Sequence, residues 1–270
     1  MKTIRILAAA GAAMLLGAVS CTEASSDKKD NKTIGFQTIE HQQTFTLQGS
    51  AKDYGTDRDI LFSCEADILM PENIYGFDAD TLRTAIIKTA FDTTATSGSS
   101  QLIEDVFRAT AAESGYMPVD TVVPENVYDG CLIVEGDIAA LTSSILSYSV
   151  TVSRYEPMAA HGMYGSYFIN YDLKNGKIFN LSDIVTTDGL AALPAILRKI
   201  ARNMRNYVGP TDLTALPADG NFYIDLRNNL VFVYQPYEIA SYAQGLIEIP
   251  IPAYQISENL TPYGKSLFNL

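Results

Sequence analysis

Residues that could carry out catalysis or bind a metal are scarce in this sequence. His41 and His161 are the only histidines, and the chain lacks a Gly-x-Ser-x-Gly nucleophile elbow, a Gly-x-x-x-x-Gly-Lys phosphate loop, a His-Glu-x-x-His pair and a Gly-x-Gly-x-x-Gly turn. Pairs of carboxylates could support glycoside hydrolysis, but 31 acidic residues make a chance pair unavoidable. We therefore expect a binding protein with no catalytic residues, no metal and no cofactor.

His161 is the better candidate of the two histidines for a binding site. Small residues flank it in the sequence Pro-Met-Ala-Ala-His-Gly, where a loop can present the imidazole together with Gly162 and Tyr164. The alternative is a loop histidine that only makes structural hydrogen bonds. His41 lies among polar residues near the N-terminal tether, and we expect its side chain to be solvated.

A polar insert between two apolar runs, 230–234 and 246–251, is a second candidate site. It holds Tyr237, Glu238 and Tyr242 between a proline and a glycine. One interpretation is a structural corner, in which the tyrosine hydroxyls and the Glu238 carboxylate bind the backbone. The other is a recognition surface shared with the His161 loop.

The elements that must position these residues follow from hydrophobic periodicity. Period-two runs predict strands at 33–47, 58–70, 131–138, 145–155 and 164–173, and two short strands at 221–236 joined at Asn228-Asn229. Helical spacing predicts helices after Asp80, after Ser99 or Ser100, and over 188–208, whose basic second half suits the helix dipole. Strands and helices that do not alternate regularly predict an α+β fold with mainly antiparallel sheets and packed helices. We expect two closely associated subdomains, 33–156 and 157–270.

The N-terminus has the features of an export signal. Lys2 and Arg5 precede an apolar run over 6–19, which is shorter than the roughly 20 residues that a membrane-spanning helix needs. Small residues then lead directly to Cys21, as in a bacterial lipoprotein processing site. The prediction is a signal peptide over 1–20, a lipidated Cys21 and a flexible tether over 21–32, with attachment to the cell envelope at the outer membrane. The alternative is an ordinary signal peptide and a chance cysteine.

The charge of the chain favours some partners over others. Removal of residues 1–20 leaves 17 basic and 31 acidic residues, a net charge of −14. Repulsion between this charge and phosphate excludes nucleic acid as an expected partner and limits membrane contact to the lipid anchor. A basic protein partner is favoured.

The two remaining cysteines have two interpretations. Export permits a disulfide between Cys64 and Cys131. Cys64 also lies on the apolar face of a predicted strand, where a buried thiol is equally natural. No cysteine has a Cys-x-x-Cys partner or nearby histidines, so we expect no metal site.

Two stretches, 147–185 and 221–252, resemble the extracellular domain of the RsiV-like family. The shared features are an Ala-His-Gly loop, an Asn-Tyr-Asp-Leu-Lys-x-Gly-Lys strand and turn, and a Pro-Tyr-Glu-Ile-Ala-x-Tyr-Ala-x-Gly insert. They fall here on Ala160, His161 and Gly162; on Asn170, Tyr171, Asp172, Leu173, Lys174, Gly176 and Lys177; and on Pro236, Tyr237, Glu238, Ile239, Ala240, Tyr242, Ala243 and Gly245. The preceding segment resembles the companion domain of PdaC-type peptidoglycan deacetylases.

The resemblance implies a two-part α+β module outside the membrane, in a family that includes a lysozyme-binding anti-sigma factor. It implies ligand binding by His161, Gly162, Tyr164, Tyr237, Glu238 and Tyr242. Anti-sigma activity is not expected, because the chain offers a lipidated cysteine in place of a spanning helix. Deacetylase activity is not expected either, because the deacetylase catalytic domain is absent. The expected partner is an envelope protein or cell-wall glycan, with lysozyme as the sharpest candidate. The alternatives are a scaffold lipoprotein in an envelope assembly and a peptidoglycan-binding module.

Overall fold

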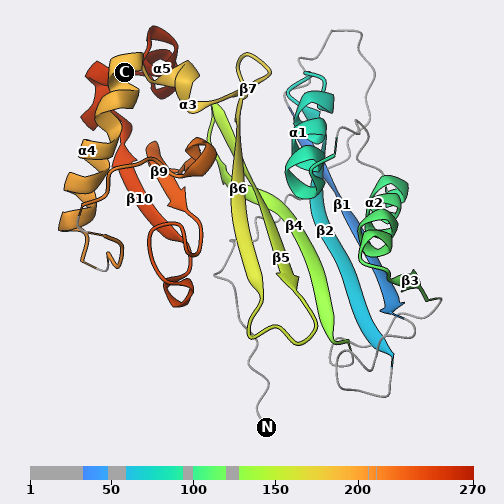
Figure 1. Ribbon diagram of the computed structural model, residues 1–270. Helices are drawn as coiled ribbons and strands as arrows, with labels where there is room; N and C mark the ends of the chain where they lie inside the picture. Colours follow the sequence, from blue (N-terminus) through green and yellow to red (C-terminus); the bar gives the residue numbers. More distant parts are fainter. Residues whose placement is uncertain (1–32, 48–58, 94–99, 120–127, 206, 211) are drawn as a thin grey trace, which may run out of the picture. The chain divides into compact units, whose positions relative to one another are not determined.

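The computed structural model describes residues 33–47, 59–93, 100–119, 128–205, 207–210 and 212–270 (Figure 1). The predicted signal peptide, Cys21 and the tether lie outside the described residues. None of the helices in the described part is both long enough and apolar enough to cross a membrane.

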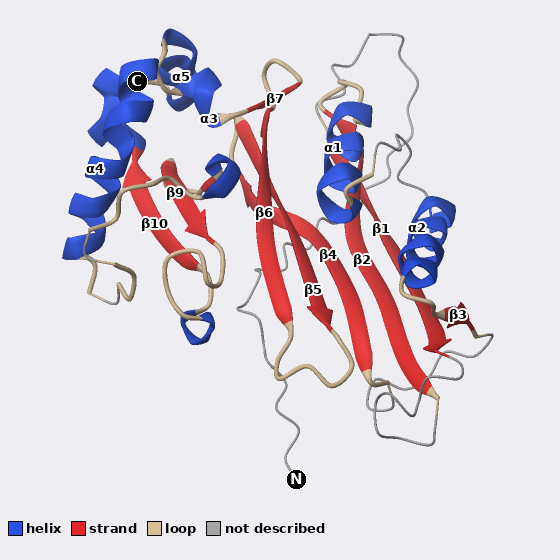
Figure 2. Ribbon diagram, in the orientation of Figure 1, coloured by secondary structure: helices blue, strands red, loops and turns tan. Residues whose placement is uncertain are grey.

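A seven-stranded sheet holds most of the predicted strands (Figure 2). Its order is β3-β1-β2-β4-β5-β6-β7, and the β2–β4 pair is parallel while the other neighbours are antiparallel. The strands are β1 (Ile34–Leu47), β2 (Ile60–Ile74), β3 (Met117–Pro118), β4 (Gly130–Leu141), β5 (Ile145–Tyr155), β6 (Met163–Asp172) and β7 (Lys177–Phe179). The α+β prediction with mainly antiparallel sheets is confirmed.

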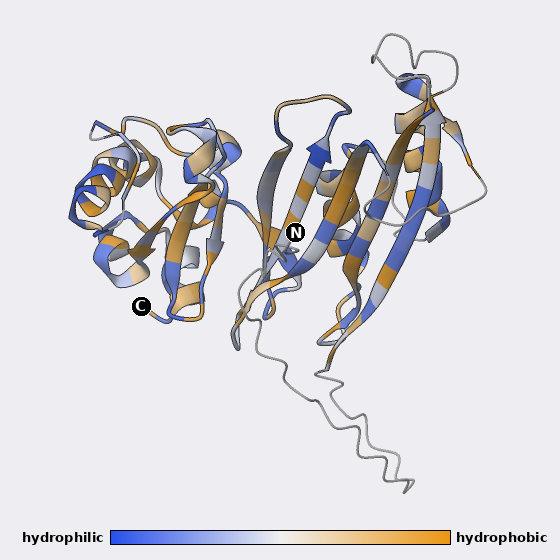
Figure 3. Ribbon diagram, turned by 90° about the horizontal axis from the view of Figure 1, so that it is seen from below, coloured by the Kyte–Doolittle hydropathy of each residue, from blue (hydrophilic) through white to orange (hydrophobic). Residues whose placement is uncertain are grey.

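Hydrophobic and hydrophilic residues alternate along strands of this sheet, as the colours of Figure 3 show. Successive side chains of a strand point to opposite faces, so the alternation separates an apolar face from a polar one. On one face, Phe62, Cys64 and Ile68 of β2 are buried in a core with helices α1 (Asp80–Phe91) and α2 (Ser100–Glu113). Asp80 is the first residue of α1, and Ala79 is its capping residue. The Asp78 carboxylate accepts the Asp80 N–H. The other face of the sheet carries polar residues.

A three-stranded antiparallel sheet organises the second core. Its order is β10-β9-β8, and it is formed by β8 (Phe222–Ile224), β9 (Asn229–Tyr234) and β10 (Ile247–Pro252). Its apolar side packs with α3 (Leu181–Ile184), α4 (Thr187–Asn203) and α5 (Pro262–Phe268).

Helix α4 is shorter than the sequence predicted. It begins after Thr186, whose side chain accepts the Gly189 N–H, and it ends at Asn203 rather than at residue 208. Beyond it the chain is extended at Met204, and Tyr207 donates its hydroxyl proton to the Pro210 carbonyl. Both side chains still pack on the core, so tertiary contacts of this segment outweigh its helical periodicity.

Polar side chains join the two sheets, and we call Ser147, Asn170, Asn221 and Gln235 the inter-sheet cluster. The Asn170 amide donates to the Phe222 carbonyl at 2.9 Å, while the Ser147 hydroxyl donates to Asn170 Oδ1 at 2.7 Å and accepts the Ile224 N–H at 3.0 Å. Ser147 and Asn170 are almost completely buried. The backbone of β8 is thereby paired with side chains of β5 and β6.

The rest of the inter-sheet cluster covers the edge of β6 that β7 leaves open. Strand β7 pairs only with Asn170, Tyr171 and Asp172. Farther along β6, the Asn221 and Gln235 amides bind the Phe168 N–H and both backbone groups of Ser166, at 2.7–3.1 Å. A primary amide carries the same donor and acceptor as a peptide group, so these two side chains take the place of a neighbouring strand.

The predicted division at residues 156 and 157 falls in the connection between β5 and β6, which pair over their length in one sheet. Residues 31–270 form one compact unit. The two subdomains stay a prediction.

The candidate disulfide is not formed. Both cysteines are among the described residues, and no bond joins Cys64 to Cys131. The β2–β4 register places Cys64 beside Leu132 and Cys131 beside Ser63, so the two side chains point to opposite faces of the sheet. Cys64 is a buried thiol, and burial raises its pKa to about 12.

Candidate functional site

The structure brings the two sequence candidates, the His161 loop and the polar insert, into contact. The His161 ring stacks on Tyr242 with centroids 4.2 Å apart and planes at 24°. Tyr237 lies 5.6 Å from Tyr242, and Tyr164 meets the same ring edge-on at 5.9 Å. We call these four side chains the His161 cluster.

Hydrogen bonds fix the tautomer of His161. Its Nδ1 lies 2.8 Å from the Gly162 carbonyl oxygen, which can only accept, so Nδ1 carries the proton. In the neutral ring Nε2 is then an acceptor, and it receives the Tyr237 hydroxyl proton at 3.1 Å. Both ring nitrogens therefore have hydrogen-bond partners, one in the backbone and one in the cluster. His161 stays exposed, and Tyr237 is 55% exposed.

Tyr237 is held in a conformation that a bulky side chain rarely adopts. Its φ is +69°, in the left-handed region, directly after the buried Pro236. The Glu238 carboxylate stabilises this corner, because it accepts the Gln235 N–H at 2.7 Å and the Ala218 N–H at 2.6 Å. Backbone strain of this kind is retained where the surrounding structure enforces it, and it occurs often at ligand sites.

Gly245 returns the insert to β10 with a φ of +68° and a ψ of −151°, a combination open essentially only to glycine. A Cβ at this position would lie 3.0 Å from the Tyr164 hydroxyl. The insert is therefore both a corner and a presented surface. Glu238 belongs to the corner, and Tyr237 and Tyr242 belong to the His161 cluster.

The strand and turn around Asp172 have a structural role. Asp172 is completely buried and accepts four hydrogen bonds, from the Lys174 and Asn175 N–H groups, the Asn175 amide and the Tyr263 hydroxyl. Burial alone would raise the pKa of this carboxyl, but the hydrogen bonds outweigh it and lower the pKa below its usual value. Asp172 thus fixes the β6–β7 turn and ties α5 to it.

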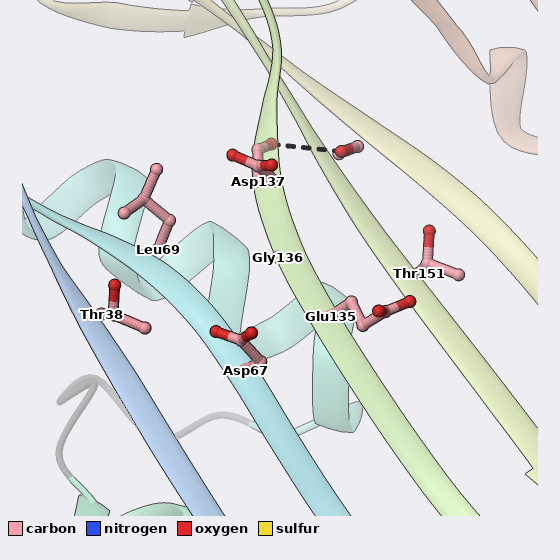
Figure 4. A pocket seen from close by; sticks show the side chains of 8 residues that line it. Thr38, Asp67, Leu69, Glu135, Gly136, Asp137 and Thr151 are labelled. Carbon is pink, nitrogen blue, oxygen red and sulfur yellow. Dashed lines mark hydrogen bonds between the residues drawn. The ribbon is translucent and has the colours of Figure 1, made fainter. Parts of the chain in front are cut away.

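The polar face of the seven-stranded sheet carries a row of acids that the sequence patterns did not single out. Glu40 lies opposite Asp67 in the β1–β2 register, and Asp67 lies opposite Glu135 in the β2–β4 register. Asp67 and Glu135 line a hollow of about 360 Å³ together with Asp137 (Figure 4). Like charges on adjacent strands repel, so this face favours a cationic partner. In β2 and β4 the acids alternate with core residues, and this alternation could have predicted the row of acids on the polar face.

The expectation that His41 is solvated is wrong. Its ring lies 5.9 Å from Phe107 of α2, since His41 shares the helix-covered face of β1 with Ile39 and Phe45. Its Nε2 is buried without a hydrogen-bond partner among the described residues. Nor does any group of three or more His, Cys, Asp or Glu residues in that part of the chain form a metal-binding arrangement.

Comparison with known proteins identifies one segment that matches a family model, and a shared fold. Residues 182–254, from α3 through the insert and β10, match a family model described as protein of unknown function, DUF3298. No curated protein matches the chain.

Two solved structures of DUF3298 proteins resemble the chain. A family member from Bacteroides fragilis is 20% identical with a TM-score of 0.66, covering 89% of this chain and 98% of its own. A family protein from Pseudomonas aeruginosa is 16% identical with a TM-score of 0.56, covering 86% of this chain and 96% of its own. The chain thus matches the DUF3298 model over residues 182–254 and shares the fold of these two proteins.

Proposed function

We propose that the protein is a lipid-anchored module of the cell envelope that binds a protein or glycan ligand through the His161 cluster. The leading candidate for the ligand is a basic, lysozyme-like cell-wall hydrolase. The observation that carries the proposal is the cluster itself, in which a loop and an insert from different sheets present stacked, exposed rings. Tyrosine and histidine rings supply contact area at a low cost in side-chain entropy, which suits a recognition surface.

Charge supports a basic ligand. The predicted mature charge of −14 and the acidic row on the sheet attract a cationic protein and speed its encounter with the cluster. Such attraction raises the association rate more than the affinity, so aromatic contacts must supply the binding energy. The RsiV-like resemblance of the His161 loop and the insert points to the same ligand class.

Binding, and not catalysis, is the proposed activity. A general base needs a nitrogen or carboxylate that can reach a substrate proton. His161 instead directs Nδ1 to the Gly162 carbonyl and Nε2 to the Tyr237 hydroxyl, and the Glu238 carboxylate is occupied by two backbone N–H groups.

A capture experiment tests the ligand. The immobilised protein should retain lysozyme at low salt and lose part of it at moderate salt, because exposed charges are screened. Tyr237→Ala and His161→Ala should each weaken capture by about tenfold or more, as for residues central to an interface. Tyr254→Ala is the matched control, because Tyr254 is also exposed (65%) but has no contact with the cluster rings.

The other outcomes separate the alternatives. Retention of one envelope protein instead of lysozyme, unaffected by Tyr237→Ala, would favour the scaffold lipoprotein. Binding to purified sacculi that depends on Tyr237 would favour a peptidoglycan-binding module. Equal lysozyme capture by the Tyr237 and Tyr254 variants would contradict the assignment of the cluster.

Anchoring through Cys21 is tested separately. Cys21→Ala removes the thiol that would be lipidated, so the protein should move from the membrane fraction to the soluble fraction on cell fractionation. Cys131→Ala is the control and should leave the protein in the membrane fraction, since Cys131 forms no disulfide with Cys64. Membrane attachment of the Cys21 variant would show that another feature holds the protein there.

A further inference from the structure

A cavity of about 520 Å³ lies at one end of the seven-stranded sheet, where three connections converge. They are the β2–α1 connection, the β4–β5 turn and the β6–β7 turn. The cavity is lined by Tyr75, Phe77, Ser143, Leu173 and Lys174. Its volume falls in the range of small-molecule sites.

Hydrogen bonds hold each connection in place. The Asn73 side chain accepts the Gly76 N–H, Thr142 Oγ1 accepts the Ile145 N–H at 3.0 Å, and the Leu173 N–H donates to the Ser144 carbonyl at 2.9 Å. The third turn is fixed by Asp172. A cavity with walls fixed in this way loses little conformational entropy when a ligand binds.

Two backbone features place the aromatic wall. Tyr75 has a φ of +51°, which is strained for a bulky residue. The Phe77 ring lies against Gly176, whose φ is +65° and where any Cβ would overlap the ring. Phe77 is nevertheless 37% exposed, so part of this large ring remains open to a ligand.

The lining combines an apolar wall with one cation. Tyr75, Phe77 and Leu173 offer apolar surface, and Ser143 offers a hydroxyl. Lys174 is the charged residue of the lining, and it forms no ion pair with a described residue. The nearby Asp172 carboxylate is buried and already accepts four hydrogen bonds.

We propose that this cavity binds a small amphipathic organic anion. The apolar body of the ligand packs on Tyr75 and Phe77, and its carboxylate lies at the Lys174 ammonium with Ser143 as a second donor. The site is independent of the His161 cluster, so it adds a second ligand to the proposed function.

The test uses 2-naphthoate as the probe and the uncharged 2-naphthamide as its matched analogue. Two-dimensional NMR titration of the purified protein should shift the amide resonances of Leu173, Lys174 and Ser143, with a dissociation constant of about 1 mM or lower for so small a ligand. The amide analogue and the Lys174→Glu variant should each bind at least about tenfold more weakly, because each lacks the charge-assisted contact. Ser143→Leu, which fills the cavity, should abolish the shifts.

Lys199→Glu is the control for net charge, because Lys199 is exposed on α4 and changes the charge by the same amount. It should leave the dissociation constant unchanged within about twofold. Equal weakening by Lys174→Glu and Lys199→Glu, or shifts that spread away from the three turns, would overturn the proposal. Lysozyme capture does not enter this readout, so either proposal can fail alone.

Discussion

Asp172→Asn is expected to lower the free energy of unfolding by about 2 to 4 kcal/mol at neutral pH. The substitution keeps one oxygen for the turn N–H groups but places an amide N–H₂ where Oδ2 accepts from the Asn175 amide and the Tyr263 hydroxyl. Two donors then face each other in a completely buried site. Urea unfolding of both proteins at pH 7 measures the difference.

The effect should depend on pH with a definite sign. The folded-state pKa of Asp172 is lowered because its hydrogen bonds outweigh burial, so its contribution is fully present above the unfolded pKa of about 3.9. The contribution is lost as the pH falls through the lower, folded-state pKa. The stability difference between wild type and Asp172→Asn should therefore shrink as the pH falls below about 4.

Asp225→Asn provides the matched control. Asp225 stands at the start of the β8–β9 turn and accepts the Arg227 and Asn229 N–H groups and the Asn229 amide, the same local pattern as Asp172. It is only half-buried, and no tyrosine among the described residues donates to it. Its substitution should cost about 1 kcal/mol. Equal losses for the two variants would show that the turn, and not the contact with α5, supplies the stability.

The regular elements could be predicted from the sequence because their periodicity is local. The 145–155 strand prediction coincides with β5, and the Asn175-Gly176 pair forms the predicted β6–β7 turn with Gly176 at positive φ. The sequence also repeats Asp-Leu-Lys-Asn at 172–175 as Asp-Leu-Arg-Asn at 225–228. Each repeat places an aspartate where it can accept the backbone N–H groups of its own turn.

The site itself depended on contacts that no local pattern contains. His161 and Tyr237 lie 76 residues apart and meet only because the inter-sheet cluster joins β6 to β8 and β9. The acidic row likewise requires the strand register, which brings Glu135 beside Asp67 across the parallel β2–β4 pair. The end of α4 was missed for a related reason, since the packing of Met204 and Tyr207 decides it.

Asn170→Ala is expected to lower the free energy of unfolding by about 2 to 4 kcal/mol. The substitution leaves the Phe222 carbonyl without the Asn170 donor and removes the hydrogen bond from the Ser147 hydroxyl to Asn170, in a site where Asn170 is only 3% exposed. Buried polar groups that lose a partner carry their full desolvation cost. Asn203→Ala is the control, because Asn203 is exposed and binds only the Lys199 carbonyl, so it should cost about 0.5 kcal/mol.

The Asn170 variant should also loosen the sheets selectively. Strands β9 and β10 flank the insert, and β8 pairs with β9. The inter-sheet cluster holds β8 against β5 and β6, and β6 follows the His161 loop. Amide hydrogen exchange should therefore accelerate in β8 and at the insert, while β2 and β4 keep their protection. The double variant Ser147→Ala, Asn170→Ala should be more stable than the sum of the single losses predicts, by about 1 kcal/mol, because each single change already removes the hydrogen bond between the two side chains. Additive losses together with uniform exchange would mean that the cluster does not position the His161 site.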